Sequence, residues 1–179
     1  KSKIPLPGDT ICCDIGYGDG ISPGGHRYCL VVVDSGSRNS WCYGLRHLTG
    51  HTLCIAFQQL FVDMGNPQHT RRLLCDFDTK LIKGQVKSLM LRRNIRVISS
   101  APYRRSQNGL VERYWATAVR MARSLLQEAN LPKKFWFWAV RRSFELMNLV
   151  PMEVGTNPDG TKQHKSPFEL YYGQKSDLR

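Results

Sequence analysis

The sequence predicts an α/β fold, a five-stranded mixed sheet with helices on both faces. Two observations favour this class. Three short runs of β-forming residues come first and are separated by turn residues, which is typical of an antiparallel meander. Strand-like and helix-like patterns then alternate, which is typical of parallel crossover units. At 179 residues the chain can bury a sizeable core within one domain.

The first three predicted strands cover residues 10–17, 27–34 and 40–46. Each is an apolar run rich in β-branched or aromatic residues. The segments between them, DGISPGG and SGSRN, contain the residues that favour tight turns. Because short turns join neighbouring strands, we expect an antiparallel meander here.

A helix follows, because apolar residues recur at helical spacing between Leu53 and Met64, and the sequence GNP then ends it. The next pattern is a strand at 71–76, a helix at 84–93 and a second strand at 95–99. A strand, a helix and a strand of these lengths indicate a parallel crossover. These two strands complete the predicted sheet.

Two longer helices are predicted next. An apolar stripe runs from Val111 to Leu126, with Arg113 and Arg120 on the opposite side. The second helix is expected to begin at Pro132, since proline is favoured at the first helical position. Its aromatic run FWFW is most simply core, with base stacking by one exposed ring as the alternative.

The segment after the second helix is polar and contains proline and glycine. We predict a loop over 151–167, followed by a short helix. We therefore assign residues 1–150 to the core domain and 151–179 to a C-terminal extension of it.

Positive charge is concentrated in the middle of the chain. The formal net charge is +12, and residues 71–150 carry 17 basic and 5 acidic residues, whereas basic and acidic residues balance in the flanking segments. Such an imbalance favours a phosphate-rich partner, because lysine and arginine displace condensed counterions from it. A membrane partner is not expected, since no run of eighteen apolar residues exists and no helix pairs a basic face with an unsupported apolar one.

The cysteines do not have the spacing of a zinc site. The chain has six, and none forms a C-x-x-C pair. We expect reduced, buried thiols of an intracellular protein. They are Cys12, Cys13, Cys29, Cys42, Cys54 and Cys75.

Three acids stand out by position. Asp14 interrupts a predicted strand, Asp76 ends another, and Glu112 borders the apolar stripe of a helix. Carboxylates near a core are costly unless paired, and a divalent cation is one way to offset that cost. Three converging carboxylates would hold two Mg²⁺ ions about 4 Å apart. Asp34 and Asp78 are the competing candidates, and Asp34 has the alternative role of starting a turn.

The stretch SSAPYRRSQNGLVERYWATAVRMARSLLQEANLPKKFWFWAV, residues 99–140, resembles the integrase core of copia-type LTR retrotransposons. That family's pattern has PY, polar residues, Q-N-G-x-x-E-R, a helix, and then L-P with aromatic residues. The segments CCDIGYG, RYCLVVVDSGSRNSWCYGL and SPFELYYGQKSDL are similar to the family in the same order. The resemblance covers nearly the whole chain and is to the catalytic core alone, without the zinc module and the following domain that flank such cores.

The resemblance implies an RNase H-like fold and a catalytic triad of two aspartates and a glutamate. Carried over, the triad is Asp14, Asp76 and Glu112, and residues 77–111 supply its 35-residue gap. One departure is that the family follows its second aspartate with Asn-Gly, whereas this chain reads CDFDTK. The spacing favours Asp76 over Asp78.

The resemblance also implies a function: a Mg²⁺- or Mn²⁺-dependent polynucleotidyl transferase that trims element DNA 3′ ends and joins them to target DNA. It implies two metal ions per site, a homo-oligomer, flanking integrase domains of a longer polyprotein, and action in the nucleus by way of cytoplasmic virus-like particles. Two alternatives stay open, an RNase H-type nuclease and an inactive DNA-binding or assembly module from a decayed element.

DNA contacts are expected from basic and polar residues around the triad. In the segment before Glu112, the arginines would bind phosphates and the tyrosine would stack or pack. The full set comprises Tyr103, Arg104, Arg105, Gln107, Asn108, Arg113, Arg120, Lys80, Lys83 and Lys87.

Overall fold

The computed structural model describes residues 5–65, 69–76, 81, 83–99 and 109–176. Its first five strands form one sheet, and their bounds are β1 (Thr10–Tyr17), β2 (Tyr28–Asp34), β3 (Ser40–Leu45), β4 (Arg72–Cys75) and β5 (Arg96–Ser99). The helices are α1 (Gly50–Asp63), α3 (Gly84–Arg92), α4 (Gly109–Glu128), α5 (Trp136–Leu149) and α6 (Pro167–Tyr172), with a short 3₁₀ helix η2 (Lys133–Phe135) before α5.

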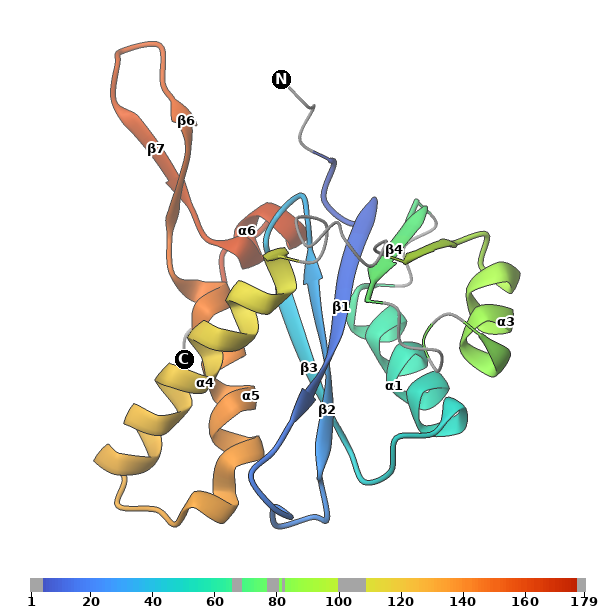
Figure 1. Ribbon diagram of the computed structural model, residues 1–179. Helices are drawn as coiled ribbons and strands as arrows, with labels where there is room; N and C mark the ends of the chain where they lie inside the picture. The colour runs from blue at the N-terminus through green and yellow to red at the C-terminus, as the bar shows by residue number, and fades with distance from the viewer. Residues whose placement is uncertain (1–4, 66–68, 77–80, 82, 100–108, 177–179) are drawn as a thin grey trace.

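The sheet has the strand order β3-β2-β1-β4-β5. Strands β1, β2 and β3 pair antiparallel, while β4 and β5 run parallel to β1. The predicted meander followed by two parallel strands is therefore confirmed (Figure 1). Strand β1 lies at the centre and is the point where the two halves of the sheet meet.

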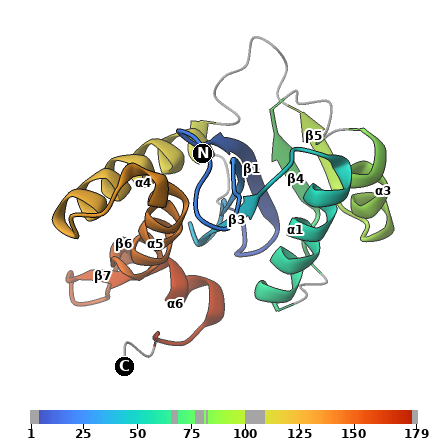
Figure 2. The same cartoon turned by 90° about the horizontal axis from the view of Figure 1, so that it is seen from below.

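Helices cover both faces of the sheet, as predicted. Along β1 the side chains alternate, so Cys13 joins a buried cluster with α1 and α3, whereas Cys12 joins one with α4 and α5. Figure 2 shows these two helix pairs on opposite sides of the strands. In the described part of the chain, no helix is both long and apolar enough to cross a membrane.

Helix ends follow local sequence signals. Thr49 and Thr52 form a capping box at the start of α1. Ser166 and Glu169 do the same for α6, and Gly173 ends α6 in the left-handed conformation with φ 71°. The tyrosines of α6 then donate hydrogen bonds to backbone carbonyls at the end of α1, which holds the C-terminal segment on the domain.

The second long helix begins later than predicted. Pro132 has an extended ψ of 148° and is the N-cap of η2, so α5 begins only at Trp136. The proline does mark the start of helical structure, but the first turn is a 3₁₀ helix. Such turns are frequent at helix N-termini.

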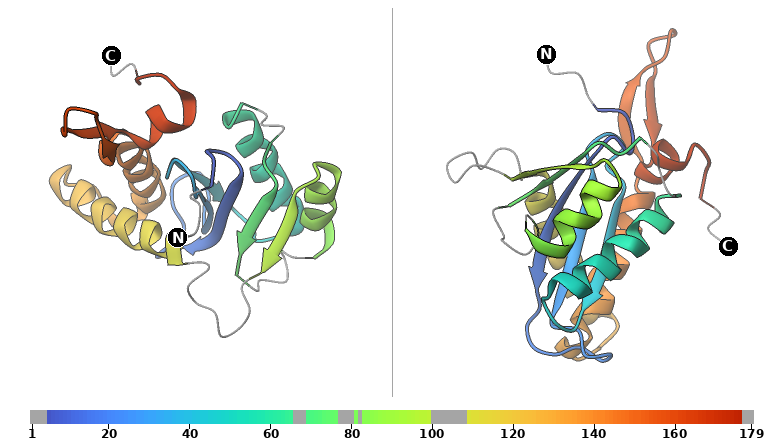
Figure 3. Two further views of the ribbon diagram at one scale, coloured as in Figure 1. Left: turned by 90° about the horizontal axis from the view of Figure 1, so that it is seen from above. Right: turned by 90° about the vertical axis from the view of Figure 1, so that its right-hand side faces the viewer.

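The segment 151–167 is a hairpin rather than the predicted loop. Strands β6 (Met152–Thr156) and β7 (Lys162–Lys165) pair antiparallel and project from the body of the domain (Figures 1 and 3). Its turn is held by Asp159, which accepts hydrogen bonds from the Thr161 amide and hydroxyl. Nearly every residue of both strands is exposed, so the alternation of apolar and polar residues that signals a half-buried strand is absent.

All six cysteines are free thiols. Five are buried and Cys54 is partly exposed, so the prediction of buried thiols holds except at Cys54. Burial raises the pKa of the Cys12 thiol to about 11, which keeps it protonated at neutral pH.

Candidate active site

Asp14 lies near the middle of the sheet, on the central strand β1. Its side chain is half-buried, and its Oδ1 accepts a hydrogen bond of 2.8 Å from the Ile15 amide. Because side chains alternate along a strand, Asp14 points to the same face as Cys12. That face is the one covered by α4 and α5.

Asp76 comes directly after the last residue of β4. Strands β1 and β4 are parallel with Cys13 opposite Cys75, so one step further in the same register brings Asp76 beside Asp14. Neighbouring strands lie about 4.8 Å apart. Leu74, two residues earlier, packs in the cluster on the α4 side, so if the strand alternation continues for one more residue, we expect Asp76 to point to that face as well.

Glu112 lies in the first turn of α4. Its neighbour Val111 is fully buried in the same cluster as Cys12, which fixes the rotation of the helix and leaves Glu112 exposed at its edge. An acid in the first turn is also favoured by the positive end of the helix dipole.

The fold thus brings two of the predicted acids together and sets the third on the same face. Asp14 and Asp76 directly follow the last pair of the β1–β4 register, Cys13 and Cys75, and Glu112 lies in the first turn of the helix that covers the face of Cys12 and Leu74. Among the described residues, no three His, Cys, Asp or Glu side chains are grouped closely enough to hold a metal ion. The assignment of the triad stays a prediction, and the competing Asp78 lies outside the described residues.

Asp34 has a structural role. Its side chain is fully buried and accepts hydrogen bonds from the Gly8 amide at 2.9 Å and from the Ser37 amide and hydroxyl at 2.7 and 2.6 Å. Burial raises the pKa of this carboxyl even though these donors favour its ionised form. The alternative prediction, that Asp34 starts the turn after β2, is confirmed.

The predicted DNA-binding residues fall into separate groups. Arg113 and Arg120 are exposed on α4, and Lys83 and Lys87 are exposed at α3, which covers the other face of the sheet. These two pairs therefore do not form one patch. The remaining residues lie outside the described part of the chain, namely Lys80, Tyr103, Arg104, Arg105, Gln107 and Asn108.

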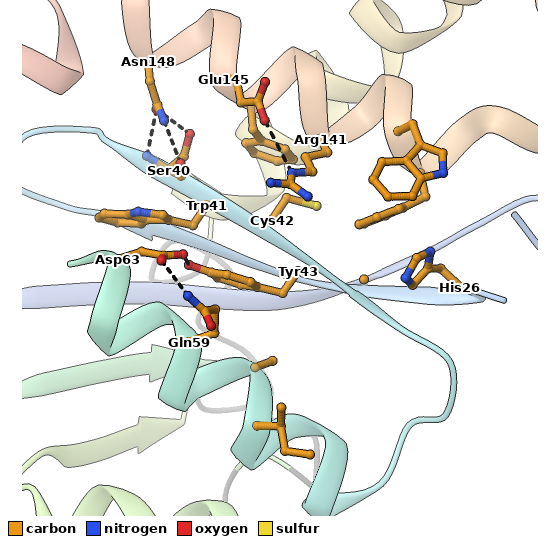
Figure 4. A pocket seen from close by; sticks show the side chains of 16 residues that line it. His26, Ser40, Trp41, Cys42, Tyr43, Gln59, Asp63, Arg141, Glu145 and Asn148 are labelled. Carbon is orange, nitrogen blue, oxygen red and sulfur yellow. Dashed lines mark hydrogen bonds and ion pairs between the residues drawn. The ribbon is translucent and has the colours of Figure 1, made fainter. Parts of the chain in front are cut away.

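The sequence did not predict a cavity of about 600 Å³ along the edge strand β3, between α1 and α5 (Figure 4). Asn148 of α5 pairs with both backbone groups of Ser40, as a neighbouring strand would. The Tyr43 hydroxyl donates to Asp63 at 2.6 Å. These residues come from distant parts of the chain, and no local pattern in the sequence signals that they meet.

The fold defined above is the fold of retroviral integrase catalytic cores. One similar structure is the catalytic core of HTLV-2 integrase, solved with magnesium in a trimeric form, with a TM-score of 0.65. The match covers 93% of this chain and 97% of the HTLV-2 chain, at 17% sequence identity. A second similar structure is a simian T-cell lymphotropic virus intasome, solved in complex with a PP2A regulatory subunit, with a TM-score of 0.71. The match covers 97% of this chain and 57% of the matched intasome chain, at 17% sequence identity. The predicted RNase H-like fold is confirmed.

The sequence relatives are retrovirus-related Pol polyproteins of plant transposons. One, from transposon TNT 1-94 of Nicotiana tabacum, is 28% identical over 172 residues, which is 87% of this chain and 13% of the polyprotein. Another, from transposon RE2 of Arabidopsis thaliana, is 27% identical over 184 residues, or 96% of this chain and 12% of the polyprotein. No protein-family model matches the chain. The resemblance to copia-type retrotransposon integrases is confirmed, and the chain spans about an eighth of the relatives it matches.

Proposed function

We propose that this chain is the catalytic core of a retrotransposon integrase, which trims the 3′ ends of element DNA and joins them to target DNA. The observation that carries the proposal is the parallel register of β1 and β4, which makes Asp14 and Asp76 neighbours on the sheet face that α4 covers. The Pol relatives and the integrase-core fold support the same function.

The donor chemistry of these acids fits magnesium. Mg²⁺ prefers oxygen ligands and is commonly bound by one or two carboxylates together with substrate phosphates. Asp14 and Asp76 would supply the first pair of ligands, and Glu112 the third carboxylate. Two bound ions would supply electrostatic stabilisation to the attacking and leaving oxygens of a phosphodiester.

The chain's own groups have two tasks in this reaction. The carboxylates define where the reacting phosphate sits, and the basic residues around α4 hold the DNA backbone against that point. In strand transfer, the DNA 3′-oxygen forms a bond to phosphorus while the bond from phosphorus to the target's own 3′-oxygen breaks. The nucleophile belongs to the DNA, so no protein side chain needs to form a covalent intermediate.

The proposal includes partners. The substrates would be element-end DNA and target DNA, the active form a homo-oligomer, and the natural context a longer polyprotein with flanking integrase domains acting in the nucleus. The matched segment is 13% or less of each relative, which supports the polyprotein context. Among the structural neighbours, the HTLV-2 core was solved in dimeric and trimeric forms, which supports oligomers.

A strand-transfer assay with duplex DNA and Mg²⁺ or Mn²⁺ tests the proposal. Asp14→Asn, Asp76→Asn and Glu112→Gln should each lower the rate by at least a hundredfold, because each removes a charged ligand, and chelation should abolish it. Their melting temperatures should stay near that of the unchanged chain. Asp78→Asn is the matched control and should retain activity.

The alternatives give different results in the same assay. Metal-dependent cutting of RNA in a hybrid, without joining of DNA, would identify an RNase H-type nuclease. DNA binding without cutting or joining under any metal condition, in the chain with its flanking domains, would identify an inactive binding module. Loss of activity in Asp78→Asn but not in Asp76→Asn would move the second acid to position 78.

A further inference from the structure

A second cavity, of about 580 Å³, opens where α4, α5 and the turn between β1 and β2 meet. Figure 1 shows the second half of α4 running beside α5, with the β1–β2 turn next to the start of α5. We call this cavity the α4–α5 cleft. It is separate from the β3 edge cavity, because the two share no lining residue.

Two indole rings line the cleft: Trp115 is half-buried and offers the accessible ring, while Trp136 is only 7% exposed and forms the base of the wall behind it. A Cβ added at Gly16 would lie 2.5 Å from the Trp115 ring, and one added at Gly18 would lie 2.0 Å from the Trp136 ring. The two glycines therefore let both rings lie directly on the backbone of β1 and the turn after it. The Trp136 Nε1 also donates a hydrogen bond of 3.1 Å to the Gly20 carbonyl, which satisfies its polar group. An aromatic surface held this way is preorganised for stacking or apolar contact.

The charges of the cleft favour an anionic ligand. Arg123 and Lys133 line it and are exposed, and within the described residues neither takes part in an ion pair. Asp19 also lines the cleft and is exposed, so the net charge of the lining is one positive unit. An apolar wall with two cations suits a ligand that has a flat apolar body and a phosphate.

The cleft lies along the same edge of α4 as Glu112. At 3.6 residues per turn, Val119 and Arg123 fall within roughly 20° of Glu112 around the helix axis. At 1.5 Å per residue they lie about 10 and 16 Å further along it. Both residues line the cleft. A DNA strand bound at Glu112 and following this edge would reach the cleft within a few nucleotides.

We propose that the α4–α5 cleft binds one unpaired nucleotide of a DNA strand, with its base against the aromatic wall and its phosphate on Arg123 and Lys133. This inference rests on the proposed function, because it takes the strand to be the one held at Glu112. An acidic peptide has the same charge, but most of the lining residues, including both cations, belong to the segment 71–150 that holds the excess of positive charge, and the cleft shares a helix edge with the candidate site. Both facts favour DNA.

A five-nucleotide single-stranded DNA with 2-aminopurine at its centre tests the inference, with the full chain in EDTA so that no catalysis is needed. Binding should quench 2-aminopurine fluorescence through stacking. The double variant Arg123→Gln/Lys133→Gln should raise the Kd at least tenfold. The matched double variant Lys134→Gln/Arg141→Gln removes the same charge outside the cleft and should change the Kd by less than twofold.

A second variant tests the cleft itself. Val119→Glu places a carboxylate on the half-exposed edge of the cleft and should abolish the quenching while circular dichroism stays unchanged. Equal Kd values for the two double variants, or binding without quenching, would overturn the inference. So would an acidic fluorescent peptide whose binding depends on Arg123 and Lys133 when oligonucleotide binding does not. The proposed function is judged separately, by strand transfer with Mg²⁺.

Discussion

At the residue scale, the aspartates of this chain differ in what surrounds them. Asp34 is fully buried and meets three donors, so its hydrogen bonds explain its place in the fold. Asp14 on β1 and Asp76 directly after β4 are partly exposed, and they follow the paired residues Cys13 and Cys75. Two carboxylates that continue one parallel register offer oxygen ligands to a divalent cation, which is why we propose a functional role for the pair.

Asp9 gives a prediction about pH and stability. Its carboxylate accepts a 2.6 Å hydrogen bond from Arg72, which lowers the pKa of the carboxyl below 3.8. The ionised form is therefore favoured in the folded state. The stability it contributes is present above pH 3.8 and is lost as the pH falls through the lowered pKa.

Asp9→Asn should consequently lower the free energy of unfolding at pH 7 by less than about 1 kcal/mol, because Arg72 is half exposed. The difference from the unchanged chain should be smaller at pH 2.5 than at pH 7, because pH 2.5 lies below the ordinary pKa of 3.8 and part of the contribution is lost there. Urea denaturation at the two pH values measures it, with Asp19→Asn as an exposed control. A difference of the same size at both pH values would contradict this assignment.

The candidate site was only partly predictable from single residues. The resemblance to copia-type integrases, with its 35-residue gap, selected Asp14, Asp76 and Glu112. Strand alternation predicts that the first two share a face. Spacing does not determine how closely Glu112 approaches them, because that depends on how α4 packs on the sheet. The sequence places Trp115 in an apolar stripe and Trp136 in the FWFW run, for which base stacking was the alternative to core. It does not show where either ring is seated, since the glycines beneath them lie about a hundred residues away.

At the scale of elements, periodicity predicted the meander, the crossover and the long helices, because each of these elements buries one face or both. It did not predict β6 and β7, whose side chains are exposed on both faces. An isolated two-stranded hairpin is marginally stable in water. Its order here depends on turn residues such as Asp159 rather than on a core.

Asn148 gives a prediction at this scale. Its amide binds both backbone groups of Ser40 at the free edge of β3, at 2.8 and 2.7 Å. Asn148→Ala should lower the free energy of unfolding by about 1–3 kcal/mol, because it leaves these partly buried groups without a partner. Glu145→Ala, on the same helix and exposed, should cost less than about 0.5 kcal/mol. Equal losses in urea denaturation would show that the Ser40 contact is not stabilising.

At the scale of the whole molecule, the positive charge is concentrated in one segment of the chain, although its exposed members lie on both faces of the sheet. The excess lies in the segment 71–150, which contains the parallel strands β4 and β5 and the helix α4. The net charge alone indicates a polyanionic partner. The fold adds which side of the sheet this partner would approach. The strand register leads to Asp14 and Asp76 on the face that α4 covers, and α4 carries exposed arginines.

The salt dependence of DNA binding tests this arrangement. Changing Arg113 and Arg120 together to Gln should make the slope of log Kd against log salt shallower by about 2, if each arginine neutralises one phosphate. Arg141→Gln is the control, since Arg141 is paired with Glu145 on α5. Fluorescence titrations of duplex DNA over a range of salt concentrations give the slopes. An unchanged slope in the double variant would exclude phosphate contacts at these positions.

The proposed catalytic centre is tested most directly by anomalous diffraction from crystals of the chain soaked in Mn²⁺. We expect manganese peaks within coordination distance of carboxylate oxygens of Asp14, Asp76 and Glu112, and loss of those peaks in Asp76→Asn. Manganese bound elsewhere, or a bound ion that Asp14 and Asp76 do not share, would contradict the assignment of this site as the catalytic centre.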